Sequence, residues 1–110
     1  MQKTSGSNFK TPLQNERRVH VKIEVIGHLN QITGKRKFEI LLKEPTIQGL
    51  IESLRNTYGT NFDRAVRHPD SGEFLVLILV NGQDIDFLQK SDTLLSDKDE
   101  VVMVPLVAGG

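Results

Sequence analysis

The best candidate for chemistry in this sequence is the α-carboxylate of Gly110, at the end of an uncharged segment. Glycine has no Cβ, so a tail that ends Gly109-Gly110 can lie extended and enter a channel too narrow for larger side chains. A frayed terminus is the alternative, since chain ends are often disordered. With glycine at about 7% of average composition, however, a terminal Gly-Gly arises by chance in only about 0.5% of chains, which favours a functional interpretation. The segment consists of Pro105, Leu106, Val107, Ala108, Gly109 and Gly110.

Other side chains are weaker candidates for chemistry. The sequence has no cysteine, which excludes a thiolate nucleophile, a disulfide scaffold and cysteine-based zinc sites. His20, His28 and His68 fall on different predicted elements and lack the spacing of metal ligands. Neither a calcium-binding loop nor a Ser-His-Asp triad is recognisable. We therefore expect a protein that catalyses no reaction itself and holds no metal and no permanently bound cofactor.

Length and charge limit the possible function classes. A chain of 110 residues and 12.4 kDa corresponds to one domain. Its 14 basic and 14 acidic side chains cancel, which argues against a module that binds nucleic acid through phosphate contacts. No apolar run approaches the roughly 18 residues of a membrane span, and no signal peptide is evident. We expect a soluble, cytoplasmic protein that is monomeric when free.

The balanced charge hides an asymmetry between residues 1–18 and the rest of the chain. These residues carry four basic side chains against Glu16, a net charge of +3, which leaves −3 for residues 19–110. Small and polar residues replace β-branched aliphatic ones there, which predicts a mobile polar arm ahead of the domain. The alternative is a basic arm that docks on an acidic partner. The four basic residues are Lys3, Lys10, Arg17 and Arg18.

Hydrophobic periodicity predicts the elements that position the tail. Alternating apolar residues indicate a half-buried strand at 19–25 and a second at 36–43, most simply an antiparallel hairpin. Apolar residues then recur at helical spacing over 47–58, directly after Thr46 as the N-cap. Gly49 inside this helix costs about 1 kcal/mol relative to alanine, which a close approach of helix to sheet would explain.

The second half of the domain is predicted to be mostly strand. Seven consecutive apolar residues at 74–80 are typical of a strand covered on both faces. Asn81-Gly82 predicts a type I′ turn, a brief strand follows at 84–87, and residues 101–104 form the last strand. One main helix on one face of a mixed sheet, with the last strand parallel to the first, is the α+β architecture called β-grasp or ubiquitin-like.

The predicted domain spans residues 19–104 and the tail spans residues 105–110. Together they resemble the MoaD/ThiS family of ubiquitin-like sulfur carriers, especially the small subunit of molybdopterin synthase and archaeal small modifier proteins. The Asn81-Gly82 turn supports the resemblance. So does the stretch 93–101, which is similar to a family hairpin of the form t-x-L-x-D-G-D-E-V.

Two places depart from the family pattern. Lys98 stands at a turn position where family members often have glycine. Val104, Pro105 and Leu106 stand where the family commonly has an aromatic residue and two prolines.

The resemblance implies that the chemistry is done on this protein by an enzyme. A ubiquitin-activating-type adenylyltransferase would use ATP to join the Gly110 carboxylate to AMP, and persulfide sulfur would then give a C-terminal thiocarboxylate. That sulfur would pass to a dithiolene precursor of molybdopterin, with the synthase large subunit as partner, or to tRNA or thiazole in related pathways. Alternatively, the activated carboxyl would be joined to lysines of target proteins by an isopeptide bond. A β-grasp interaction module with an inert tail is a third, more remote class.

The resemblance also implies a partner-binding surface on the apolar sheet face beside residues 105–108. By alignment of the first and last strands, Ile26 and Val104 match positions that contact partners in the family. Ile85 is a further candidate near the same face. A role in the core or at its boundary is the alternative for each of them.

Overall fold

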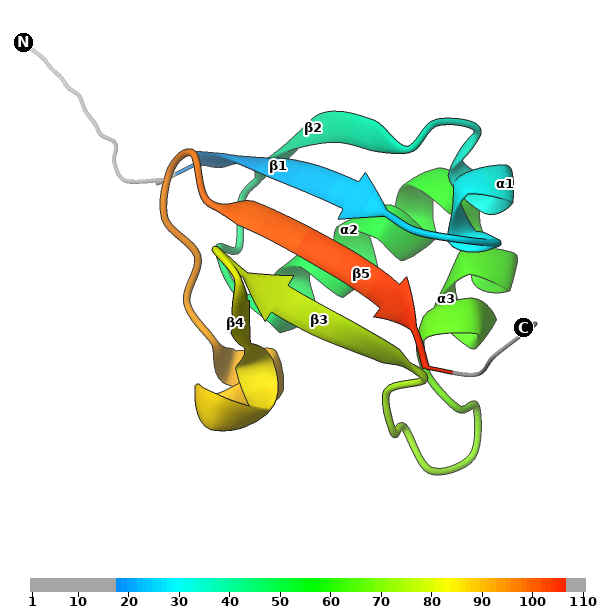
Figure 1. Cartoon of the computed structure of the whole chain (residues 1–110). Coiled ribbons are helices and arrows are strands. Elements are labelled where there is room, and N and C mark those ends of the chain that lie inside the picture. Colours follow the sequence, from blue (N-terminus) through cyan, green and yellow to red (C-terminus); the bar gives the residue numbers. More distant parts are fainter. Residues whose placement is uncertain (1–17, 107–110) are drawn as a thin grey trace, which may run out of the picture.

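The computed structural model describes residues 18–106, and residues 1–17 and 107–110 lie outside the described part (Figure 1). None of the helices in this part is long and apolar enough to cross a membrane. A second, seven-residue helix directly follows the main predicted helix. The elements are β1 (Val19–Val25), α1 (Leu29–Thr33), β2 (Lys37–Leu42), α2 (Ile47–Tyr58), α3 (Thr60–Val66), β3 (Val76–Val80), β4 (Gln83–Asp84), the 3₁₀ turns η2 (Ile85–Phe87) and η3 (Lys90–Asp92), and β5 (Glu100–Pro105).

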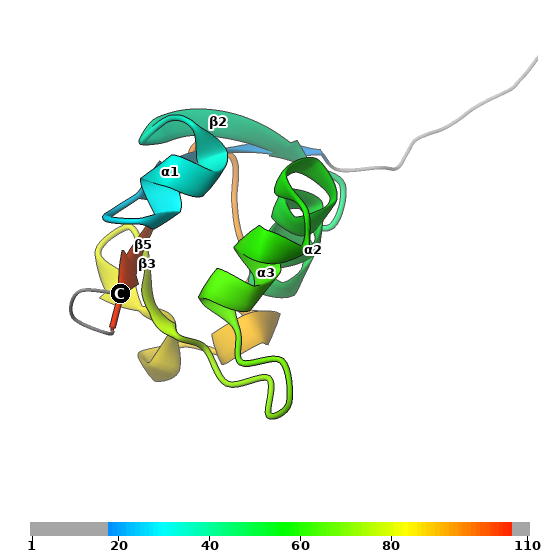
Figure 2. The same ribbon diagram turned by 90° about the vertical axis from the view of Figure 1, so that its right-hand side faces the viewer.

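The five strands form one mixed sheet in the order β2-β1-β5-β3-β4. β1 and β5 run parallel in the middle, with Ile23 opposite Val101 and Val25 opposite Met103. The other neighbouring strands are antiparallel. The helices lie on one side of the sheet (Figure 2). The predicted β-grasp fold is therefore confirmed.

The core lies between the sheet and α2, which begins where the sequence predicts. The Thr46 hydroxyl accepts a hydrogen bond from the N–H of Gly49 at 3.0 Å and so satisfies one amide of the first turn. The apolar stripe of α2 is buried against the inner face of the sheet, and only Tyr58 at its end is partly exposed. The core includes Leu50, Ile51 and Leu54 from α2, Phe62 and Val66 from α3, and Val21, Ile23, Ile78, Val101 and Met103 from the sheet.

Gly49 is explained by a different contact from the one expected. A Cβ at this position would collide with the carbonyl oxygen of Glu44 and would lie 2.9 Å from the Cβ of Glu44. The close approach is thus between the first turn of α2 and the loop that precedes it, and the expected approach to the sheet is wrong. A tight turn into the helix brings these groups together, because the N–H of Thr46 donates to the same Glu44 carbonyl at 2.8 Å.

The expectation that the apolar run 74–80 is covered on both faces is also wrong. Val76 and Ile78 are buried under the helices, whereas Leu77 and Leu79 point to the opposite face and are half-buried. Within residues 18–106 the helices cover only one face of this sheet, so the other face of β3 is open and apolar there.

Two tight turns involve residues with positive φ. Asn81 and Gly82 have φ of 51° and 85°, as the predicted type I′ turn requires. Lys98, at the position where the family often has glycine, has φ of 73°. Its turn is fixed to β1, because the carboxylate of Asp97 accepts from the N–H of His20 at 2.9 Å.

Candidate functional site at the end of the last strand

The sheet holds the chain up to Leu106. The N–H of Leu106 donates to the carbonyl oxygen of Leu75 at 3.1 Å, and Pro105 lies opposite Val76 in the ladder between β5 and β3. The last strand is longer than predicted and includes Pro105. Only the last four residues follow this anchored position.

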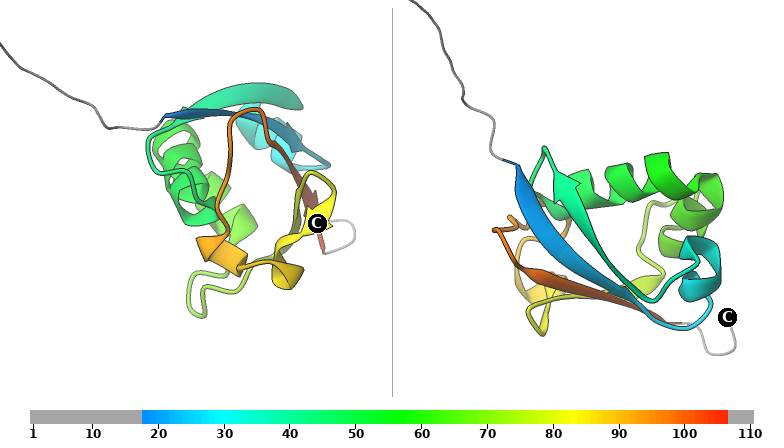
Figure 3. Two further views of the ribbon diagram at one scale, coloured as in Figure 1. Left: turned by 90° about the vertical axis from the view of Figure 1, so that its left-hand side faces the viewer. Right: turned by 90° about the horizontal axis from the view of Figure 1, so that it is seen from above.

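Pro105 lies at a place where a missing N–H has little cost. The N–H of Ile26 donates to Met103 at 3.0 Å, and the pairing of β1 with β5 ends there. The Pro105 ring then packs against Gly27, where an added Cβ would lie 3.5 Å from the Pro105 Cγ. Gly27 has φ of +67°, so the backbone conformation at this position also favours glycine. Figure 3 shows the end of β5 beside the turn that follows β1.

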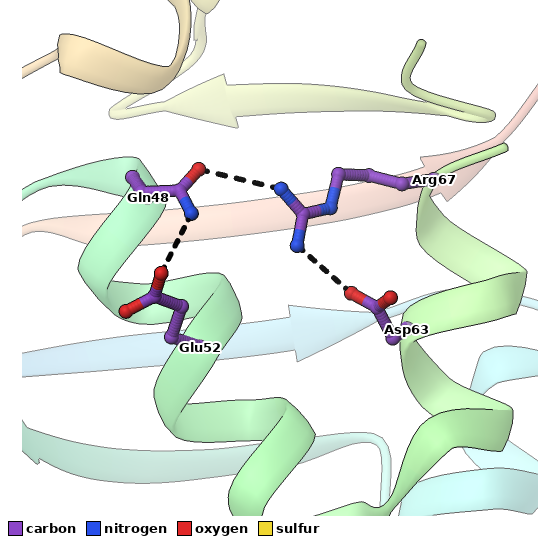
Figure 4. Close-up of polar contacts among 4 residues, drawn as sticks. All are labelled: Gln48, Glu52, Asp63 and Arg67. Carbon is purple, nitrogen blue, oxygen red and sulfur yellow. Dashed lines mark hydrogen bonds and ion pairs between the residues drawn. The ribbon is translucent and has the colours of Figure 1, made fainter. Parts of the chain in front are cut away.

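A polar network on the helical side ties α3 to α2 (Figure 4). Arg67 forms an ion pair with Asp63 at 3.0 Å and donates to the side-chain oxygen of Gln48 on α2 at 3.3 Å. Gln48 in turn donates to Glu52 at 2.9 Å. The carboxylate of Asp63 and the guanidinium of Arg67 are about three-quarters buried, which makes this pair a stronger restraint than an exposed one.

The same helix end fixes the backbone that anchors Leu106. The N–H of Leu75 donates to the carbonyl of Val66, the last residue of α3, at 2.7 Å. Arg67 and Phe74 form an isolated bridge that closes the loop between α3 and β3. The position at which the tail leaves the domain is therefore set by α3 as well as by the sheet.

The reacting end predicted from sequence, Gly109 and Gly110, lies outside the described residues, as do Val107 and Ala108. Four extended residues span about 13–14 Å at most. An enzyme that acts on Gly110 must therefore contact the domain close to Leu106.

An apolar surface suited to such contact lies beside Leu106, on the sheet face opposite the helices. Strand alternation places its side chains outward, and each is half-buried. The β3–β5 register pairs Leu77 with Val104 and Leu79 with Val102, and Ile26 lies beside the end of β5, because its N–H donates to Met103. Leu106 adjoins this surface and is 61% exposed. We call it the open-face patch, and it consists of Ile26, Leu77, Leu79, Val102 and Val104.

Apart from Leu41 on β2, the rest of the open face is mostly polar. Glu24 forms an ion pair at 2.8 Å with Arg36, whose side chain is exposed, and a hollow of about 450 Å³ lies over β2, β1 and the start of β5. Charged residues of both signs line that hollow. The apolar half, over β5 and β3, is the half next to the tail.

Ile26 and Val104 lie in the open-face patch, where the sequence placed them, and their contact with a partner stays a prediction. Ile85 does not lie there. It is 2% exposed and belongs to the core, which corrects its assignment to the partner surface. The N–H of Asp86 donates to the carboxylate of Asp84 at 2.9 Å and starts the turn η2, which directs Ile85 inward.

Sequence reasoning missed three members of the patch, Leu77, Leu79 and Val102. The signal was present in the apolar run 74–80 but was interpreted as burial on both faces. A strand that helices cover on both faces has a continuous run of apolar residues. A strand with one buried face and one open apolar face has the same run.

Comparison with known proteins decides the family. The family model described as "ThiS family" matches residues 23–110, which is most of the domain and all of the tail. The chain belongs to the ThiS family. It is thus one of the ubiquitin-like carrier and modifier proteins that include the MoaD and ThiS types.

Relatives of this ThiS-family chain agree with the assignment. A protein of Archaeoglobus fulgidus named "Putative sulfur carrier protein" is 27% identical over 82% of this chain and 98% of its own. The small archaeal modifier protein 1 of Methanosarcina acetivorans has a TM-score of 0.70 at 25% identity, over 86% of this chain and 99% of its own. A Pyrococcus furiosus protein titled "Putative molybdopterin converting factor, subunit 1" has a TM-score of 0.66 at 30% identity, over 81% and 99%.

Proposed function

We propose that this ThiS-family chain carries sulfur on its C-terminal Gly110 for the synthesis of molybdopterin. An ATP-dependent adenylyltransferase of the ubiquitin-activating type adenylates the Gly110 carboxylate, and the chain itself acts as the substrate. ATP is bound by that enzyme, and the carrier needs no cofactor of its own.

The chemistry follows from the poor reactivity of a carboxylate as an acyl donor. Its oxygen attacks the α-phosphorus of ATP, pyrophosphate leaves, and the mixed anhydride with AMP provides a good leaving group. The terminal sulfur of a persulfide displaces AMP, and cleavage of the S–S bond by a thiol then leaves a thiocarboxylate. The thiocarboxylate can deliver sulfur to a dithiolene precursor.

The observation that carries the proposal is the anchoring of Leu106, followed by four small or apolar residues. The bond from Leu106 to Leu75 fixes where the tail starts, and correct placement of reacting atoms is worth several orders of magnitude in rate. The open-face patch beside it offers a docking surface for the activating enzyme and for the molybdopterin synthase large subunit. Support for molybdopterin as the product comes from the name of the Pyrococcus furiosus relative.

The second candidate is a protein modifier, favoured by the likeness to the archaeal modifier of Methanosarcina acetivorans. Here a lysine amine of a target protein attacks the activated Gly110 carboxyl, and an isopeptide bond forms. Both functions need the same adenylate, so one chain can serve both.

Intact mass spectrometry separates the two candidates. The chain is incubated with ATP, the cognate activating enzyme and a persulfide donor. Replacement of oxygen by sulfur raises the mass by about 16 Da, whereas conjugates of higher mass on a denaturing gel indicate modification. The proposal would be contradicted if this chain gave neither product while the same enzyme preparation activated a control carrier.

A further inference from the structure

Strand β3 has a free edge. β4 pairs only with Leu79 and Val80, so within residues 18–106 no strand lies beside residues 76–78 on that side (Figure 1). A free strand edge exposes backbone groups that can pair with another extended segment.

The hydrogen bonds at both ends of β3 show which backbone groups face this edge. The N–H of Leu106 donates to Leu75, and the N–H of Asn81 donates to the carbonyl of Glu100 at 2.7 Å. Odd-numbered residues of β3 therefore bond to β5. The N–H groups of successive strand residues point to opposite edges. The N–H groups of Val76 and Ile78 therefore point away from β5, toward the free edge.

A groove of about 720 Å³ follows this edge, between the loop that precedes β3 and the turns η2 and η3. Its rim is acidic, with three carboxylates and one lysine, a net charge of −2. Lining residues include Glu73, Phe74, Ile78, Asp84, Asp86 and Lys90. An extended, basic segment therefore fits the groove, since its backbone can pair with β3 and its cations can face the rim.

We propose that residues 1–10 of this same chain dock in the groove as an extended segment along β3. The part of the segment that can reach the groove, residues 1–10, carries Lys3 and Lys10 and no acidic side chain, a net charge of +2, which complements the rim. The proposal does not rest on the chemistry of Gly110.

The segment is long enough to reach. By the sheet register, Ile78 lies level with Met103 and with Val25. The groove is then about three strand spacings across the sheet and about seven residues along it from Arg18, a distance of about 27 Å. Roughly eight extended residues cover that distance, so residue 10 reaches the level of Ile78 and residues 1–10 are left to lie in the groove. The shortest path crosses the open face, so a docked segment covers part of the open-face patch.

Amide hydrogen exchange measured by NMR tests this directly. The full chain is compared with a variant that begins at Arg18. If the segment is docked for about four-fifths of the time, removing it speeds exchange of the Val76 and Ile78 amides about fivefold. Amides in α2 keep their rates. Equal rates at Val76 and Ile78 in the two proteins would overturn the proposal.

Charge variants provide the second arm of the test. Glu73→Gln with Asp86→Asn neutralises two rim carboxylates in the full chain, and Glu39→Gln with Glu44→Gln makes the same charge change elsewhere on the surface. The rim variant should lower the equilibrium constant for docking two- to fivefold for each charge removed. Salt at 0.5 M should also lower this constant. Docking in the groove would be contradicted if the control pair had the same effect as the rim pair, or if neither pair had an effect.

Discussion

The N–H of Leu106 donates to the carbonyl oxygen of Leu75 at 3.1 Å, so pairing of the sheet continues one residue past β5. A second proline at this position, as the family commonly has, cannot make that bond. In this chain the bond leaves only residues 107–110 beyond the anchored part.

Leu106→Pro is predicted to lower the free energy of unfolding by about 0.5–1.5 kcal/mol, the usual net value of one hydrogen bond. Leu106→Ala keeps the N–H and serves as the matched control, and its effect should be smaller because Leu106 is largely exposed. Urea unfolding of the two variants measures the difference. Equal losses would show that the bond to Leu75 contributes nothing.

Lys98→Gly is predicted to stabilise the domain by about 0.5–1 kcal/mol. A non-glycine residue with φ near +73° is strained, and glycine removes the strain at some cost in chain entropy. Lys98→Ala keeps the strain and should leave stability nearly unchanged. Denaturant midpoints report both values, and a glycine variant less stable than the alanine variant would contradict the interpretation.

Gly49→Ala is predicted to destabilise the domain by about 1–3 kcal/mol, although alanine is the better helix former. The added Cβ meets the carbonyl oxygen of Glu44, which belongs to the backbone and cannot rotate away. Asn56→Ala, on the exposed side of the same helix, should be neutral or slightly stabilising. Thermal unfolding compares them, and a stabilised Gly49→Ala protein would show that the loop gives way.

Much of this fold could be predicted from the sequence, because period and capping residues act locally. Thr46 as N-cap, the stripe through Leu54 and the Asn81-Gly82 turn were all found where expected. The parallel pairing of the first and last strands followed from the handedness of the crossover.

The errors arose where a pattern has two tertiary solutions. An apolar residue such as Leu77 looks the same whether a helix or a partner covers it. The burial of Ile85 depends on the turn η2, which short-range propensity does not indicate. The anchoring of Leu106 depends on Leu75, 31 positions earlier, a long-range pairing that no local rule reveals.

The open-face patch yields a prediction about partner binding. Leu77→Asp and Val104→Asp should each weaken binding of the activating enzyme by at least about tenfold, since a charge at the centre of an apolar interface loses its hydration. Leu41→Asp, at an exposed position on β2 outside the patch, is the control. Isothermal titration calorimetry gives the affinities, and circular dichroism checks that each variant is folded. If all three variants weakened binding of the enzyme equally, the enzyme would bind outside the open-face patch.

The central claim is that the Gly110 carboxylate is the group that is activated. ATP–pyrophosphate exchange with the cognate activating enzyme measures that step alone, before any transfer of sulfur or formation of a conjugate. A variant that lacks Gly110 should support no exchange above background while keeping the circular dichroism spectrum of the parent, because the shortened tail cannot place its oxygen at the α-phosphorus. If that variant supported exchange as fast as the parent, the carrier and modifier functions would both be wrong for this chain.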